Sequence, residues 1–163
     1  MKSILLLSDT HGHIGKEMIR HAKTVDEVWH AGDIGSLEVT DILSKHALVR
    51  AVHGNIDSHE VRIEHPKEQL FECEGMKVWM IHIGGYPPNY TKRLAPLLYQ
   101  KKPDIFICGH SHILKVIYDK KLNLLHMNPG AIGKSGFHKV RTMLKFKIEN
   151  KRVFDMEIIE YPI

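Results

Sequence analysis

The sequence predicts an α/β protein in which two β-sheets pack face to face and helices cover the outside. Two observations lead to this prediction. In the first half, short continuous apolar runs alternate with amphipathic stretches, as in the β-α-β units of a parallel sheet. From Glu68 onward, apolar and polar residues more often alternate one by one, as in antiparallel strands with one solvent-exposed face.

The first half contains three continuous apolar runs, each typical of a strand that is buried on both faces. These runs are Ile4–Leu7, Val28–Ala31 and Leu48–Val52. Between the first two, apolar residues recur at helical spacing from Ile14 to about Lys23, which predicts an amphipathic helix. Before the third, Ser36 can cap a helix that reaches about Ser44.

The second half is predicted to begin with a hairpin that turns at Glu74-Gly75. We expect strands at 70–73, 78–83, 105–108, 113–118, 122–127, 142–148 and 153–159, and a helix at 91–100. In the last strand, Phe154, Met156 and Ile158 should share one apolar face. No linker interrupts the pattern, so residues 1–163 are expected to form a single domain.

Composition and charge narrow the class of protein. The chain is 43% hydrophobic and 26% charged, which is typical of a soluble globular protein, and no segment approaches the ~20 apolar residues that span a bilayer. The net charge of +4 does not by itself indicate nucleic-acid binding, although it suits an anionic substrate. Cys73 and Cys108 fit reduced thiols better than a disulfide framework. We therefore expect a cytoplasmic protein that does not associate with membranes and that could form a homo-oligomer.

Five of the predicted strands end in polar turns that contain glycine. The turns are Asp9-Thr10-His11-Gly12, Gly32-Asp33, Gly54-Asn55, His82-Ile83-Gly84-Gly85 and Gly109-His110-Ser111-His112. Because ligands bind at the carboxyl ends of strands in such sheets, we expect these turns to converge. Each turn alone is a common cap or loop, and only the ordered set of five indicates a functional site.

The side chains of these turns are oxygen and nitrogen donors without a thiolate. They are Asp9, His11, Asp33, Asn55, His82, His110 and His112. Such donors suit manganese, iron, nickel or zinc. Seven ligands are too many for one ion with an open position, but they suit two ions that share a carboxylate. Two divalent ions beside two aspartates would leave a positive site that attracts a phosphate.

In its order and spacing, this set resembles the pattern of the calcineurin-like metallophosphoesterases, D-x-H, G-D, G-N, H and G-H-x-H, and in particular their small bacterial and archaeal phosphodiesterases. The resemblance covers residues 3 to about 136 and includes Asn128-Pro129-Gly130. It implies a four-layer α-β-β-α sandwich of two mixed sheets. It also implies a phosphodiesterase in which a metal-bound hydroxide attacks a small phosphate-ester substrate.

The resemblance also implies the ligand sets and roles. Asp9, His11 and His112 would bind one metal ion. Asn55, His82 and His110 would bind the other, and Asp33 would bridge the two. Asp33, Asn55 and His110 would be catalytic, and Asn55 would also contact the substrate. Mn²⁺ is the favoured metal, with Ni²⁺, Fe²⁺ and Zn²⁺ as alternatives.

The chain departs from the family pattern at one position. Many members have G-N-H-D or G-N-H-E, in which the histidine contacts the substrate and protonates the leaving group, whereas this chain has Ile56. General acid catalysis is worth about 10²–10⁴-fold, so its loss predicts a preference for diesters with activated leaving groups. His13 and His59 are nearby candidates for contacting the substrate in its place, although both also fit ordinary surface histidines.

Two alternatives to a phosphodiesterase stay open. The resemblance extends to a retromer subunit that keeps this fold as a binding scaffold without activity, and Ile56 favours that alternative. The presence of all seven ligands favours an enzyme. A phosphomonoesterase of the same family is disfavoured by the missing histidine.

Overall fold

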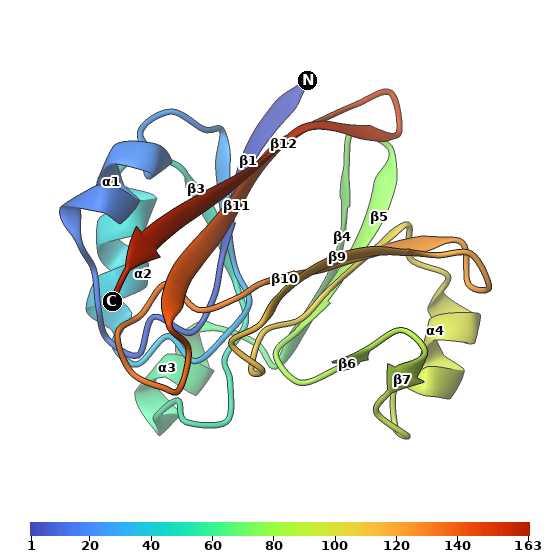
Figure 1. Ribbon diagram of the computed structural model, residues 1–163, viewed down its shortest axis with the longest axis horizontal. Coiled ribbons are helices and arrows are strands. Elements are labelled where there is room, and N and C mark those ends of the chain that lie inside the picture. Colours follow the sequence, from blue (N-terminus) through green and yellow to red (C-terminus); the bar gives the residue numbers. More distant parts are fainter.

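Two five-stranded mixed sheets form the centre of the protein, and the computed structural model describes all residues from 1 to 163 (Figure 1). The first sheet consists, in spatial order, of β12 (Arg152–Pro162), β11 (Val140–Glu149), β1 (Lys2–Leu7), β2 (Glu27–His30) and β3 (Leu48–Ala51). The second consists of β4 (Glu68–Cys73), β5 (Met76–Ile81), β8 (Ile105–Ile107), β10 (Leu124–Pro129) and β9 (Leu114–Asp119). In each sheet three neighbouring strands pair in parallel, and each of the other strands pairs antiparallel with its neighbours.

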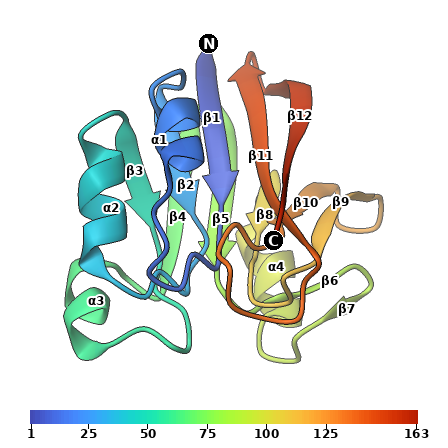
Figure 2. The same cartoon turned by 60° about the vertical axis from the view of Figure 1, so that its left-hand side comes forward.

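Four helices and a small hairpin complete the fold. The helices are α1 (Lys16–Ala22), α2 (Leu37–Ser44), α3 (His59–Glu64) and α4 (Ala95–Lys101). The hairpin pairs β6 (Gly85–Tyr86) with β7 (Asn89–Tyr90). Figures 1 and 2 show α1, α2 and α3 beside the first sheet and α4 beside the second. Each helix falls short of what spanning a lipid bilayer requires in length and apolar content.

Three apolar layers hold the sheets and helices together. Between the sheets, Trp29 of β2 belongs to the same buried cluster as Met80 and Ile107 of the second sheet. A second cluster joins the outer face of the first sheet to α1, α2 and α3, and a third joins Trp79 and neighbouring residues to α4. The predicted four-layer α-β-β-α sandwich is therefore confirmed.

The continuous apolar run of β1 follows from its position in these layers. Ile4 and Leu6 belong to the cluster between the sheets, whereas Leu5 and Leu7 belong to the cluster under the helices. Successive side chains of a strand point to opposite faces, and both faces of β1 are buried, so no polar residue interrupts the run.

Some predicted element bounds were wrong. The first helix begins at Lys16 instead of Ile14, the fourth begins at Ala95 instead of Thr91, and α3 and the β6–β7 hairpin were not predicted. Only Val61 is buried among the six residues of α3, so this helix has no apolar periodicity to detect. Its start is set by Ser58, whose hydroxyl accepts a hydrogen bond from the Val61 amide.

The alternation predicted for the last strand was also wrong. A register shift against β11 and a left-handed φ of 51° at Asp155 mark a bulge in β12. Val153 and Met156 pack against the cluster between the sheets, while Phe154 does not. Ile158 is 51% exposed because β12 is an edge strand. One extra residue in the strand therefore disrupts the expected common face.

The two cysteines are free, and both are buried. Cys73 lies in the layer between the sheets, and Cys108 lies in the layer beneath α4. Since they occupy different layers, they do not form a disulfide framework.

Candidate metal centre

The five predicted turns meet at one end of the two sheets. Backbone hydrogen bonds run from Asp9 N to Gly32 O and from His11 N to Asp33 O, joining the turns after β1 and β2. The turn after β8 joins the turn after β5 through Gly109 N and His82 O. Each of these bonds joins two turns of the same sheet at the carboxyl ends of its parallel strands, where the sequence predicts a site. The two sheets are connected there by bonds from His82 Nδ1 to Ala31 O and from the His110 amide to Asp9 Oδ2.

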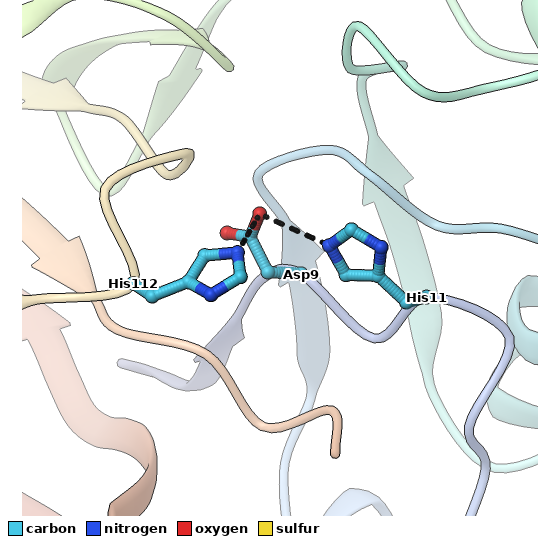
Figure 3. Close-up of side chains that lie close together, drawn as sticks. All are labelled: Asp9, His11 and His112. Atoms are coloured by element: carbon cyan, nitrogen blue, oxygen red, sulfur yellow. Dashed lines mark ion pairs between the residues drawn. The ribbon is translucent and has the colours of Figure 1, made fainter. Parts of the chain in front are cut away.

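Two groups of side chains offer metal-ligating atoms there. The first is Asp9, His11 and His112, and the second is Asp33, His82 and His110. Within each group, the candidate ligand atoms all lie within 4.8 Å of one another. Figure 3 shows the first group, in which Asp9 Oδ1 lies 3.8 Å from His11 Nε2 and 3.2 Å from His112 Nε2.

The carboxylate of Asp33 lies close to histidines of both groups. Its Oδ2 is 3.2 Å from His82 Nε2 and 3.6 Å from His11 Nε2. Asp9 Oδ1 is likewise 3.8 Å from His82 Nε2. The two groups are therefore contiguous, with carboxylate oxygens between their imidazoles.

Hydrogen bonds orient each carboxylate through one of its oxygens. Asp9 Oδ2 accepts from Ser8 Oγ at 2.6 Å and from the His110 amide at 3.1 Å. Asp33 Oδ1 accepts from the Ile56 amide at 3.1 Å. In both residues the other oxygen is left facing the histidines.

Two of the imidazoles are held so that Nε2 faces the carboxylates. His82 Nδ1 lies 2.7 Å from the Ala31 carbonyl, so it donates, and a neutral ring then has its lone pair on Nε2. The second imidazole is that of His112, which is held by His138. His138 Nε2 donates to Gly133 O at 2.8 Å, which leaves a lone pair on Nδ1 of neutral His138. This Nδ1 atom accepts a hydrogen bond from His112 Nδ1 at 3.2 Å, so His112 Nε2 is left to face the carboxylates. Such outer contacts orient metal-binding histidines in proteins.

The donor set fits metal cations. Asp9 Oδ1, His11 Nε2 and His82 Nε2 are buried without a hydrogen-bond partner. An unpaired buried polar atom costs about 1–3 kcal/mol, and an imidazole lone pair facing a carboxylate is repelled unless a proton or a cation lies between them. A divalent cation would provide a partner for all three atoms at once, and nitrogen and oxygen donors suit borderline or hard ions.

Electrostatics keep both aspartates ionised. Burial acts to raise the pKa of Asp9, but His11, His112, His82 and Ser8 outweigh it and hold that pKa well below its usual value. The pKa of Asp33 is also lowered, because the contact with His82 outweighs the effect of burial. Both side chains are therefore carboxylates near neutral pH.

The backbone of the candidate ligands is unusual. Five of them have a left-handed φ, namely Asp9 (55°), His11 (46°), Asp33 (54°), His110 (71°) and His112 (60°). This conformation costs about 1–2 kcal/mol for a residue with a side chain. Backbone strain of this kind concentrates at functional sites, where the surrounding structure maintains it.

Two glycines allow the turns to approach each other. A Cβ on Gly54 would lie 2.1 Å from Asp33 Oδ1, and a Cβ on Gly109 would lie 2.1 Å from Ser8 Oγ. Any larger residue at these positions would displace a candidate ligand or the hydroxyl that orients one. The glycines of the sequence pattern therefore have a steric role in the site.

Residues outside the two groups support the turns, and Asp57 is one that was not identified from the sequence. The buried Asp57 carboxylate accepts from the amides of Ile34 (3.1 Å), Gly35 (2.7 Å) and Gly54 (2.8 Å), and so ties the turn after β3 to the turn after β2. His30 is buried beneath the same turns, where its Nε2 contacts Thr10 Oγ1 at 2.9 Å. The only sequence signal for Asp57 was its place two residues after Asn55.

Three other residues named from the sequence lie at the edge of the centre or outside it. Asn55 is exposed and lines a cavity together with His82. His13 Nε2 lies 3.0 Å from Glu17 Oε1 and 3.0 Å from an Arg141 guanidinium nitrogen, and His59 is exposed at the start of α3. Neither histidine belongs to the two groups.

Comparisons with known proteins show the family to which this chain is similar. A family model described as "Calcineurin-like phosphoesterase superfamily domain" matches residues 1–151. A protein of Methanothermobacter thermautotrophicus named "Probable metallophosphoesterase" is 33% identical over 133 residues, which cover 77% of this chain and 74% of that protein.

Solved structures share the fold at lower identity. An archaeal protein described as a novel phosphodiesterase superimposes with a TM-score of 0.72 at 22% identity, covering 96% of this chain and 99% of that one. Vps29 from Entamoeba histolytica, solved in complex with Zn²⁺, has a TM-score of 0.74 at 19% identity and covers 98% of both chains. At these identities the likeness concerns the fold alone.

Proposed function

The chain belongs to the calcineurin-like phosphoesterase superfamily, and we propose that residues 1–163 form one domain that hydrolyses phosphodiesters with two divalent cations. The observation that supports this proposal most strongly is the pair of contiguous ligand groups with buried, unpartnered donor atoms. Such atoms are costly unless a cation binds, so a structural role alone does not account for them.

Each group would hold one ion. Asp9, His11 and His112 would bind the first, while His82 and His110 with the Asn55 carbonyl would bind the second. Asp33 would bridge the ions, because one of its oxygens lies between histidines of both groups. Bound divalent ions supply a water of lowered pKa and stabilise charge on the phosphoryl oxygens. Mn²⁺ suits this donor set best, and Ni²⁺, Fe²⁺ and Zn²⁺ are alternatives.

The chain's own residues contribute orientation. Ser8 and the His110 amide fix Asp9, the Ile56 amide fixes Asp33, and Ala31 O fixes the ring of His82. Asn55 would add a ligand without adding charge, which leaves the centre positive toward a phosphate. Asp33, Asn55 and His110 would thus be catalytic through the ions they hold.

The preference for diesters follows from Ile56. Its backbone amide donates to Asp33 and its side chain is 47% exposed, beside the centre but unable to donate a proton. Leaving groups that need protonation should therefore react slowly. His13 and His59 are poor substitutes, because His13 is engaged by Glu17 and Arg141, and His59 lies outside both groups.

A binding scaffold is the second candidate, favoured by the shared fold with Vps29 and by Ile56. The buried, unpartnered ligands favour the enzyme. A monoesterase is disfavoured by Ile56. The substrate would be a small phosphate ester. A cytoplasmic location and the formation of a homo-oligomer stay predictions from the sequence.

A metal-reconstitution assay tests the proposal. The protein is stripped of metal, supplied separately with Mn²⁺, Ni²⁺, Zn²⁺ or Mg²⁺, and assayed with bis-p-nitrophenyl phosphate and p-nitrophenyl phosphate. We expect hydrolysis of the diester with Mn²⁺ and much slower hydrolysis of the monoester. Absence of hydrolysis with every metal would overturn the enzyme and favour the scaffold.

Substitution of Ile56 tests the basis of the diester preference. We expect Ile56→His to raise hydrolysis of phenyl phosphate, a monoester whose phenolate leaving group needs protonation, on the order of 10²-fold if the introduced imidazole acts as a general acid. Ile56→Gln is the matched control, since it adds a polar side chain that cannot transfer a proton at neutral pH. Equal monoester rates in the two variants would reject the explanation.

A further inference from the structure

A cavity of about 430 Å³ adjoins the candidate centre and shares two residues with it, Asn55 and His82. It extends away from them between α3 and the segment that precedes α4. Ile83 and Leu94 contribute apolar surface to its lining. A substrate bound at the centre would therefore have room for an organic portion on this side.

The charged residues of the cavity all carry the same sign. Arg62, Lys67 and Arg93 line it, and no aspartate or glutamate does. The ion pairs of the chain do not include these three side chains. Three cations without an ion-pair partner, in a lining that contains no carboxylate, form a local positive potential that an anion would neutralise.

Arg62 keeps its charge uncompensated although its guanidinium is engaged. It donates to three backbone carbonyls, those of Asp57 (2.8 Å), Asn55 (3.2 Å) and Gly54 (3.3 Å). These carbonyl oxygens carry no formal charge, so the hydrogen bonds fix Arg62 to the turn after β3 without neutralising its positive charge. Lys67 and Arg93 are exposed, so both remain available to a ligand.

We propose that this cavity binds a second phosphate group of the substrate. The substrate would be a phosphodiester whose organic portion carries a further phosphate. An example is a nucleoside with a diester at its 5′ oxygen and a phosphate at its 3′ oxygen. The inference rests on the proposed function, because the diester itself would lie at the metal centre. The organic portion lies along Ile83 and Leu94, and Lys67 and Arg93 bind the second phosphate.

Two esters that differ by one phosphate test the proposal on the Mn²⁺-loaded protein. One is the p-nitrophenyl ester of thymidine 5′-phosphate, and the other is the same ester with an added 3′-phosphate. We expect kcat/KM for the 3′-phosphorylated ester to be at least about tenfold higher, as one additional charge-assisted contact would give. Equal values for the two esters would overturn the proposal and leave the phosphodiesterase intact.

Variants localise the effect. In Arg93→Gln and Lys67→Gln, we expect the ratio of the two kcat/KM values to fall toward one. Lys92→Gln is the matched control, because Lys92 is exposed on the same segment but does not line the cavity. If all three variants lowered the ratio equally, the preference would reflect general electrostatic attraction, and the assigned site would be wrong.

A binding measurement separates this inference from the proposed function. Titration calorimetry on the metal-free protein compares thymidine 3′,5′-bisphosphate with thymidine 5′-phosphate. We expect the bisphosphate to bind at least about tenfold more tightly, and the difference to disappear in the Arg93→Gln, Lys67→Gln double variant. This outcome would support the cavity even if no metal restored hydrolysis, whereas equal affinities in the unsubstituted protein would contradict it.

Discussion

Two regions of the protein contain buried histidine nitrogens without a hydrogen-bond partner. In the candidate centre these are Nε2 of His11 and of His82. In β10 both ring nitrogens of His126 lack a partner. The neighbours differ: the first two face Asp9 and Asp33, whereas His126 packs against Phe106 and Tyr90 with ring centroids 5.8 and 6.4 Å away.

Because of this difference in neighbours, the imidazole pKa is raised in His82 and lowered in His126. Burial lowers the pKa of His82, but the Asp33 and Asp9 carboxylates raise it by more. Burial and the nearby Lys115 lower the pKa of His126 to about 4, and the attraction to Asp119 does not offset them. An unpartnered histidine thus indicates a cation site only where carboxylates face it, and His126 is a neutral ring within an aromatic cluster.

The largest expected effect comes from removing a carboxylate of the first region. Asp33→Asn replaces the charge between the two histidine groups with a neutral amide, and we expect Mn²⁺-dependent diester hydrolysis to fall by about 10³-fold. Metal analysis should show fewer bound ions per chain. Asp155→Asn, an exposed carboxylate on β12, is the control and should retain activity. Full activity in Asp33→Asn would refute the bridging role.

Metal removal should destabilise the protein because the candidate centre loses its ions, and His126 should not contribute to this loss of stability. Because ions bind the folded chain, a free concentration one hundred times the dissociation constant adds about 2.7 kcal/mol of stability, or about 5–10 °C in Tm for a chain of this size. Calorimetry with and without a chelator measures the shift. His126→Leu should show the same shift as the unsubstituted protein, and Asp33→Asn a smaller one.

The second region should respond to pH. The unfolded chain protonates His126 near pH 6.5, but the folded chain does so only near pH 4, so the unfolded state binds more protons between these values. Stability is therefore lost as pH falls through this window. Relative to the unsubstituted protein, His126→Leu should gain about 2 kcal/mol between pH 7.5 and pH 5.

Urea unfolding at the two pH values measures that gain. His30, whose pKa burial also lowers to about 4, is present in both proteins, so its contribution cancels in the difference. A stability difference that does not change with pH would show that His126 is not a buried neutral ring.

The smallest expected effect concerns His138, which contacts a candidate ligand without belonging to either group. His138→Phe removes the acceptor for His112 Nδ1, and we expect at least about tenfold weaker metal binding. Competition with a fluorescent chelator measures this affinity. His138→Gln, which keeps an acceptor, should recover part of it, and equal affinities in the two variants would contradict the orienting role.

Much of the fold could be predicted because its signals are local. Strands buried on both faces require uninterrupted apolar residues, so Ile4–Leu7 and its counterparts were apparent in the sequence. The polar turns follow those strands directly, and parallel strands bring their carboxyl ends to one edge. The convergence of Asp9, Asp33 and His82 was therefore predictable without coordinates.

Only the tertiary structure decided which side chains share a partner. The bulge at Asp155, the three amides bound by Asp57 and the contact between His112 and His138 all depend on pairing between distant segments. The same packing engaged His13 with Arg141. Local patterns fix periodicity and turn chemistry, but a contact across the fold depends on how the layers pack, and no short stretch of sequence encodes that arrangement.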